Sequence, residues 1–137
     1  MWIFLVVAVA GGLYALDRHI ERKRRLRRHW RGLGLRPGLD REAFIRAVGV
    51  SENVGGAVYD YYAKKGFQPR IDDNICATLL CDDETVDVDV QVMAKSLGAP
   101  GPLDEVMYEC DLPTETIREV AVWLQHSIDC NGAGRLA

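Results

Sequence analysis

The chain has 137 residues, with 17 Lys or Arg against 20 Asp or Glu and a formal net charge of −3 at pH 7. This charge is unevenly divided: residues 1–36 hold nine basic and two acidic side chains, a net of +7, and residues 37–137 hold eight basic and eighteen acidic ones, a net of −10. The acidic part, about a hundred residues long, is large enough for one hydrophobic core without disulfide staples, and its charge disfavours a nucleic acid partner.

Residues 2–16 form an uncharged apolar run that predicts a membrane anchor. A helix needs about twenty residues to cross a hydrocarbon core of roughly 30 Å, so we expect the anchor over residues 1–20, with Arg18 and Arg22 reaching back to the headgroups. A cleaved signal peptide is the alternative, since Ala8-Val9-Ala10 has the form of a cleavage site. The lack of a positive segment before the run and the dense basic segment after it favour an uncleaved anchor.

Residues 21–36 are predicted to be a basic juxtamembrane helix followed by a linker that its glycines make flexible. Ile20, Trp30 and Leu33 roughly share one helical face, which makes the helix basic and amphipathic and suits it to anionic lipid headgroups. Because basic flanks stay on the cytoplasmic side, we expect a bacterial-type protein that passes once through the inner (cytoplasmic) membrane, with the N-terminus out and the C-terminal domain in the cytoplasm. The residues expected at the membrane surface are Arg22, Lys23, Arg24, Arg25, Arg27, Arg28, Trp30 and Arg31.

Residues 37–130 are predicted to form an acidic helical domain. Asp40 is expected to cap a first helix that ends at Gly49, and Ser51 a second helix that stops at Gly66. Both helices carry apolar residues at helical spacing, so each has one face to bury.

The glycine pair Gly55-Gly56 inside the second helix predicts a weaker helix there or the close approach of another helix. An irregular loop is expected over residues 67–75. Residues 84–97 fit two structures. Valines that alternate with polar residues are typical of a strand. Apolar residues of the same segment also share one helical face, and Gly98 then Pro100 follow it as residues that end a helix. No other strand is predicted to pair with this segment, so a helix is favoured.

The C-terminal part is predicted to hold a short helix at Pro102 to Glu109 and a final helix capped by Thr114, with residues 131–137 as a flexible tail. The fold class that follows is all-α: a single N-terminal transmembrane and juxtamembrane helix, then a small four- to five-helix bundle.

This order of helices resembles an acyl-carrier-protein domain over about residues 51–128. The stretch Ile71-Asp72-Asp73-Asn74-Ile75 resembles the acidic loop of that family, and Thr116-Ile117-Arg118-Glu119-Val120-Ala121 resembles the start of its last helix. By this resemblance Asp82 and Asp83 take the places of the aspartate and the phosphopantetheine-bearing serine. A carboxylate cannot form that phosphodiester, and Thr85 is the nearest hydroxyl. The resemblance therefore implies a degenerate, carrier-like scaffold that retains an acidic recognition face.

The sequence offers little for catalysis. His19 and His29 fall in the basic helix, and His126 has no evident nucleophile and orienting group beside it. The four cysteines lack the close pairs of a zinc site, so we expect free thiols, no metal and no cofactor. We therefore predict that the protein is not an enzyme.

Seven carboxylates within eighteen residues are predicted to form a partner-binding face: Asp72, Asp73, Asp82, Asp83, Glu84, Asp87 and Asp89. One interpretation is a solvated surface that aids solubility; the other is a face that steers a basic protein partner into place. The second predicts a membrane-anchored protein-binding module, either an adaptor or accessory subunit or an immunity protein that neutralises a basic toxin. The alternative is an atypical acyl-carrier protein that serves a membrane-associated synthase.

Overall fold

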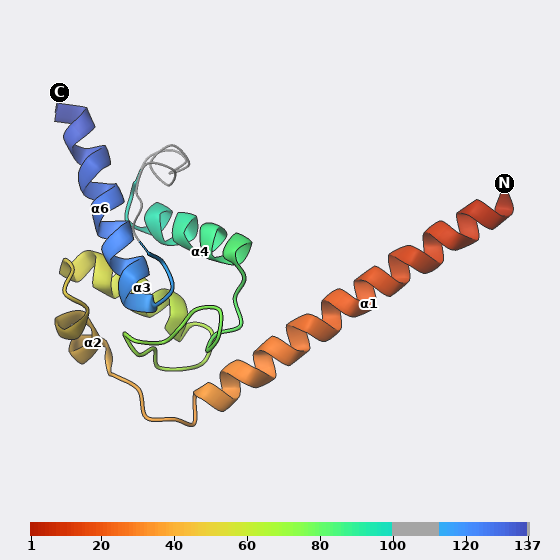
Figure 1. Cartoon of the computed structure of the whole chain (residues 1–137), viewed down its shortest axis with the longest axis horizontal. Coiled ribbons are helices and arrows are strands. Elements are labelled where there is room, and N and C mark those ends of the chain that lie inside the picture. The colour runs from red at the N-terminus through yellow and green to blue at the C-terminus, as the bar shows by residue number, and fades with distance from the viewer. Residues whose placement is uncertain (100–112, 137) are drawn as a thin grey trace.

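A computed structural model describes residues 1–99 and 113–136, with backbone alone at residues 83–84 and 131–136. Within these ranges the chain forms helices and no strand. The helices are α1 (Trp2–Leu33), α2 (Arg41–Val48), α3 (Glu52–Ala63), α4 (Asp83–Ser96) and α6 (Ile117–Leu136). Figure 1 shows α1 as a single rod that projects away from a bundle of the other four helices. The predicted all-α class, with one long N-terminal helix before a small bundle, is confirmed. The helix expected at residues 102–109 lies outside the described residues.

Side-chain caps account for where the bundle helices begin. The Asp40 carboxylate accepts a hydrogen bond from the Ala43 amide at 2.8 Å, and the Ser51 hydroxyl accepts one from the Val54 amide at 3.4 Å. Gly49 ends α2 in the left-handed region at φ 79°, which glycine adopts at little cost. Both predicted caps are thus confirmed, and the ambiguous segment over residues 84–97 is a helix.

The start and end of the last helix differ from the prediction. Thr116, rather than Thr114, caps α6: its hydroxyl accepts from the Glu119 amide at 3.3 Å, and the Glu119 carboxylate accepts from the Thr116 amide at 3.0 Å. This reciprocal arrangement is a capping box, which a pattern of Thr and Glu three residues apart encodes. The helix also continues to Leu136, past the predicted boundary at residue 130, because extending a nucleated helix costs little per residue.

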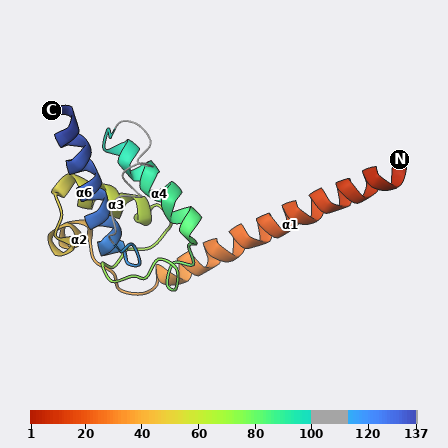
Figure 2. The same ribbon diagram turned by 45° about the horizontal axis from the view of Figure 1, so that its top comes forward.

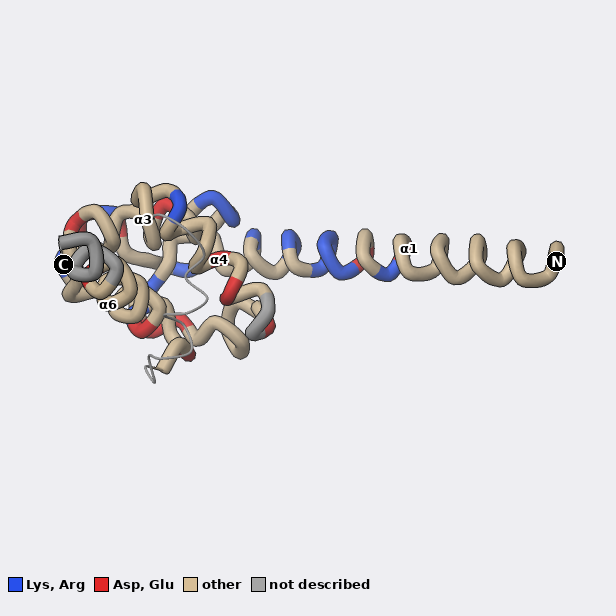
Figure 3. Tube along the Cα trace, turned by 90° about the horizontal axis from the view of Figure 1, so that it is seen from above, with Lys and Arg blue, Asp and Glu red and all other residues tan. Residues whose placement is uncertain are grey.

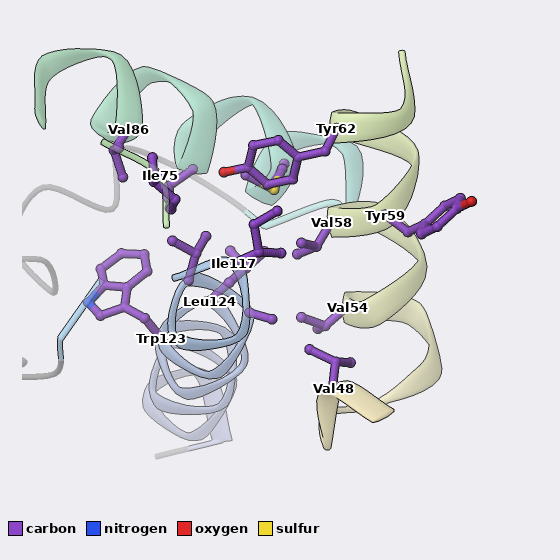
Figure 4. Packing of buried hydrophobic residues seen from close by; sticks show 14 of the residues in the cluster. Val48, Val54, Val58, Tyr59, Tyr62, Ile75, Val86, Ile117, Trp123 and Leu124 are labelled. Atoms are coloured by element: carbon purple, nitrogen blue, oxygen red, sulfur yellow. The ribbon is translucent and has the colours of Figure 1, made fainter. Parts of the chain in front are cut away.

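The core lies where α6 crosses α3 and α4. Figure 4 shows Ile117 and Leu124 of α6 directed toward Val58 and Tyr62 of α3, and all four side chains are fully buried. On the other side of α3, α2 packs so closely that a Cβ atom at Gly55 would lie 3.3 Å from Val48 Cγ1. The glycine pair therefore allows a close helix approach, as predicted.

The loop between α3 and α4 is irregular, as expected over residues 67–75, but backbone hydrogen bonds tie it to the start of α6. The Ile75 amide donates to the Glu115 carbonyl at 2.8 Å, and the Ile117 amide donates to the Asp73 carbonyl at 3.1 Å. An isolated antiparallel bridge joins Asn74 and Thr116. This loop is therefore held in one place in front of the bundle.

The linker after α1 is packed against that loop, and the prediction of a flexible link is wrong. A Cβ atom at Gly34 would lie 2.6 Å from the Gly66 carbonyl oxygen, and one at Gly38 would lie 2.4 Å from Gln68 Cβ. The glycines are needed because two backbone segments pass too closely for a side chain. The Arg70 guanidinium also donates to the Pro37 carbonyl at 2.7 Å. The end of α1 is thus joined firmly to the bundle.

Candidate functional site

The N-terminal helix α1 is long and apolar enough to cross a membrane, judged by its length and composition. Its mean hydropathy over the best eighteen-residue window is 1.5, and none of that window is buried in the fold. Figure 3 shows that the charged side chains of α1 are confined to its half next to the bundle. The apolar half therefore projects away from the rest of the protein, where a lipid phase would cover it.

The charged half of α1 docks on the loop that precedes α4. The Trp30 indole nitrogen donates to the Leu79 carbonyl at 3.0 Å, and the His29 ring nitrogen lies 2.7 Å from the Thr78 carbonyl oxygen. Lys65 Nζ lies 4.5 Å from the centre of the Trp30 ring, in a cation–π contact. Trp30 thus contacts the bundle through both its indole N–H and its ring, and it stays half-buried. Its place at the membrane surface stays a prediction.

The predicted basic residues of the membrane surface are solvent-exposed on α1: Arg22, Lys23, Arg24, Arg25, Arg27, Arg28 and Arg31. Two of them have acidic partners, since Arg22 contacts Asp82 at 2.8 Å and Arg28 lies 3.7 Å from Glu21. The basic segment and the acidic domain therefore meet directly within one chain.

Two of the seven predicted partner-binding carboxylates are not on the surface. Asp73 has 4% of its side chain exposed and forms a two-pronged ion pair with Arg36, one contact of which is 2.7 Å, while also accepting from the Arg70 amide at 2.9 Å. Asp89 is 3% exposed, because it lies on the same inward face of α4 as Val86, three residues earlier. The prediction of one exposed face is wrong for both residues, since each carboxylate is used inside the fold.

Three of the other predicted carboxylates are exposed. They are Asp72, Asp87 and Asp82, and Asp82 also caps α4 by accepting from the Thr85 amide at 2.9 Å. Asp83 and Glu84 form the first turn of α4, and their side chains are outside the described part of the chain. The acidic character is therefore concentrated around the N-terminal half of α4, where carboxylates also favour the helix dipole.

The hydrogen-bond partners of Asp82 change the pKa of its carboxyl group. Hydrogen bonds from the Thr85 hydroxyl, from Arg22 and from the Thr85 amide lower the pKa of Asp82 to about 2. Thr85 carries the hydroxyl nearest to the position where the carrier resemblance places a serine. This hydroxyl donates a hydrogen bond to the Asp82 carboxylate. This arrangement holds the hydroxyl in a structural role at the start of α4.

Asp89 belongs to a polar cluster inside the core. The Tyr61 hydroxyl donates to one carboxylate oxygen, and the other carboxylate oxygen and the Tyr62 hydroxyl have no hydrogen-bond partner among the described residues. Burial raises the pKa of Asp89, against the opposing effects of Tyr61 and Lys65, and burial raises the pKa of the neighbouring Cys81 thiol to about 11. The Asp89 carboxylate and the Tyr62 side chain are enclosed by the fold, whereas Tyr61 is half-buried. Asp89 therefore presents no exposed charge to a protein partner.

A different surface of α4 is open. Val88 and Val92, one helical turn apart, are 61% and 48% exposed, beside the exposed Asp87 and Lys95. We call Asp87, Val88, Val92 and Lys95 the α4 strip. Large apolar side chains that remain uncovered next to charged ones are typical of a protein-docking surface. The sequence did not reveal this surface, because alternating valines predict burial in a strand as readily as exposure on a helix.

The α4 strip leads into a pocket between α3 and α4. Its volume is about 560 Å³, and its walls include apolar or aromatic side chains from both helices, Tyr61, Val92 and Leu97. Asp60 and Lys64 contribute charge from α3. Figure 2 shows α4 at the edge of the bundle, on the side that faces α1.

One pair of side chains has a geometry associated with catalysis. Cys130 Sγ lies 3.5 Å from His126 Nε2, one turn apart on α6. Both residues are exposed, and among the described residues no second side chain hydrogen-bonds the His126 ring to orient it. In the described ranges, no group of three or more His, Cys, Asp or Glu is placed to hold a metal ion.

The fold and surfaces define a class of protein: a small helical bundle that contacts the end of one helix long and apolar enough to span a membrane. No protein-family model, curated protein or solved structure matches the chain. The resemblance to acyl-carrier domains therefore stays a prediction.

Proposed function

We propose that the protein is a membrane-anchored, non-catalytic docking module whose α4 strip binds a basic protein partner. The observation that carries this proposal is the exposure of Val88 and Val92 beside the exposed Asp87, with Val92 also lining a pocket. The valines and the pocket supply apolar area, which contributes affinity, and the carboxylates steer a basic partner and select against acidic ones.

The proposed location follows from charge. The basic half of α1 is expected to stay on the cytoplasmic side, which gives an inner-membrane protein with its N-terminus out and its bundle in the cytoplasm. The packed linker supports a docking role, because a bundle held at a set distance from the membrane presents α4 to partners that work there. A membrane-associated adaptor or accessory subunit and an immunity protein against a basic toxin both fit this arrangement.

The alternative function is an atypical acyl carrier. It would need a hydroxyl at the start of α4 to carry the phosphopantetheine. The hydroxyl of Thr85 donates a hydrogen bond to the Asp82 carboxylate, which gives it a role in capping α4. Intact mass of the chain from its native host tests this alternative: a phosphopantetheine adduct that disappears in Thr85→Ala would establish the carrier function and refute the docking-only proposal.

Site-specific photo-cross-linking in native membranes tests the docking proposal. The cross-linking residue replaces Val88 or Val92 in the full chain, and the matched control replaces Val122, which is 41% exposed on α6. We expect one partner to be captured from both α4 positions, through a basic segment, and not from position 122. Asp87→Lys should reduce the yield, because it reverses the charge beside the strip.

The pattern of capture decides the outcome. A yield at position 122 equal to that at the α4 positions, or a yield unaffected by both Asp87→Lys and raised salt, would refute the α4 strip as the docking surface. Charge reversal at Asp89 is unsuitable for this test, because a buried charge there would disrupt the core.

A further inference from the structure

A second pocket lies between α1 and the loop that precedes α4, where Figures 1 and 2 show the loop beside the bundle end of α1. Its volume is about 540 Å³, and three arginines from successive turns of one α1 face, Arg18, Arg22 and Arg25, line it. Leu80 closes it from the loop side. The pocket is therefore built jointly by the anchor helix and the bundle.

The electrostatics of the pocket favour an anion. Of its arginines, Arg22 is paired with Asp82 at 2.8 Å. Arg18 donates through Nε to the Tyr14 hydroxyl at 2.9 Å, which is a neutral partner. The one acidic side chain in the lining, Glu21, lies 3.7 Å from Arg28. Among the residues whose side chains the structure describes, neither Arg18 nor Arg25 forms an ion pair.

The height of the pocket on α1 matches a lipid headgroup layer. The predicted anchor, about twenty residues long, ends at Ile20. At 1.5 Å per residue, Arg18 lies about 3 Å before that point along the helix axis and Arg25 about 8 Å beyond it. The polar layer of one leaflet is about 5 to 8 Å thick, so these two arginines bracket it.

Leu80 has an unusual conformation that places an apolar wall at this level. Its φ is +57°, in the left-handed region that residues other than glycine rarely adopt, and 43% of the residue is exposed. Its neighbours Leu79 and Cys81 are buried and hold the backbone in place. Strain of this kind persists where the surrounding structure imposes it, often at binding sites. An apolar side chain that lines the same pocket as the arginines suits a ligand with an anionic head and an apolar tail.

We infer that this pocket binds the phosphate headgroup of an anionic phospholipid, with Arg18 and Arg25 on the phosphate and Leu80 against the glycerol and upper acyl chain. This inference rests on the proposed membrane anchoring and is independent of the α4 strip. Its consequence is that a bound lipid fills the space between anchor and bundle and fixes the docked orientation of the domain.

The chain offers a matched control on the same helix. Arg24 and Arg27 line a separate basic pocket of about 410 Å³ whose walls all come from α1, without a wall from the bundle. Arg18→Gln/Arg25→Gln and Arg24→Gln/Arg27→Gln remove the same charge from the same segment. Diffuse attraction to an anionic surface predicts equal effects of the two double variants, whereas a built pocket predicts unequal ones.

The experiment uses the full chain reconstituted in nanodiscs of phosphatidylcholine with added phosphatidylglycerol, and native mass spectrometry reads the lipids that stay bound. We expect phosphatidylglycerol to be retained selectively. Arg18→Gln/Arg25→Gln should lower retention about 150-fold, since each direct hydrogen bond to a charged phosphate contributes about 12-fold. Arg24→Gln/Arg27→Gln should lower retention less, by about 30-fold at most, because it removes diffuse attraction alone. Leu80→Gly, which relieves the backbone conformation and removes the apolar wall, should keep the fold and still reduce retention.

Equal loss in the two double variants, or no preference for phosphatidylglycerol, would overturn the lipid site while leaving the docking proposal intact. Soluble glycerol phosphate serves as a competitor: displacement of the lipid at low concentration would identify a free phosphate ligand and overturn the lipid assignment. Release of the chain from membranes by alkaline carbonate would overturn the anchoring, and the lipid site with it. Circular dichroism of each variant confirms that the bundle is folded.

Discussion

The buried ion pair between Arg36 and Asp73 is expected to hold the bundle against the end of α1. Asp73 contacts three segments at once: Arg36 in the linker, the Arg70 amide in the loop and, through its carbonyl, the Ile117 amide at the start of α6. Removing Arg36 leaves the carboxylate, 4% exposed, with the Arg70 amide as its remaining side-chain hydrogen bond in the described part of the chain. Breaking a buried pair in this way costs about 3 kcal/mol or more.

We therefore expect Arg36→Ala to lower the free energy of unfolding by about 3 kcal/mol and Asp73→Ala by a similar amount. The double variant should cost about 4 kcal/mol rather than the sum, because the second substitution has no pair left to break. The assay is urea unfolding of the full chain in detergent micelles. Near-ultraviolet circular dichroism is the signal, since it reports the packing of buried aromatic side chains.

The control is a pair with the same chemistry and different burial. Arg41 Nε lies 3.0 Å from Asp60 Oδ1, with about half of each side chain exposed. Exposed pairs contribute about 0.2 to 1 kcal/mol, so Arg41→Ala should have a much smaller effect than Arg36→Ala. Equal costs for Arg36→Ala and Arg41→Ala, or a coupling near zero between Arg36 and Asp73, would refute the argument that burial gives this pair its importance.

Three further outcomes follow from the same structure. Burial raises the pKa of Asp89 above its usual value near 3.8, so the folded state binds the carboxyl proton more tightly than the unfolded state. Stability is therefore lost as pH rises through the folded pKa. Asp89→Asn should remove this loss, so the stability of the variant relative to wild type should increase with pH in urea titrations. Cys81 is buried and its pKa is raised to about 11, so it should be alkylated far more slowly at pH 8 than the exposed Cys76. Peptide mass spectrometry measures both rates, and equal rates would contradict the burial of Cys81. Gly34→Ala should lower the free energy of unfolding by about 1 to 3 kcal/mol, because the new Cβ atom would meet the Gly66 backbone. Gly32→Ala is the control: there is open space around Gly32, so this variant should be neutral or stabilising in thermal melts.

Interactions between residues that are close in the sequence determine where the helices begin and end. Asp40 and Ser51 each cap a helix through an amide three residues later, and Gly49 ends one, because these interactions involve neighbours in the chain. The apolar run of α1 is likewise visible in consecutive residues. The same reasoning failed at Thr114, because two threonines lie near the start of α6 and only Thr116 stands three residues before a glutamate that completes the capping box.

Patterns of charge and hydropathy were enough to predict a basic helix with an apolar end before an acidic helical bundle. The contact between these two parts could not be predicted, because it depends on pairs far apart in the chain, such as Arg22 with Asp82 and Arg36 with Asp73. The tertiary structure also decided that Asp89 points inward while Val88 and Val92 face solvent, the reverse of what their polarity suggests. The physical reason is that caps and periodicity depend on residues a few positions apart, whereas burial and ion pairing depend on which distant segments the folded chain brings together.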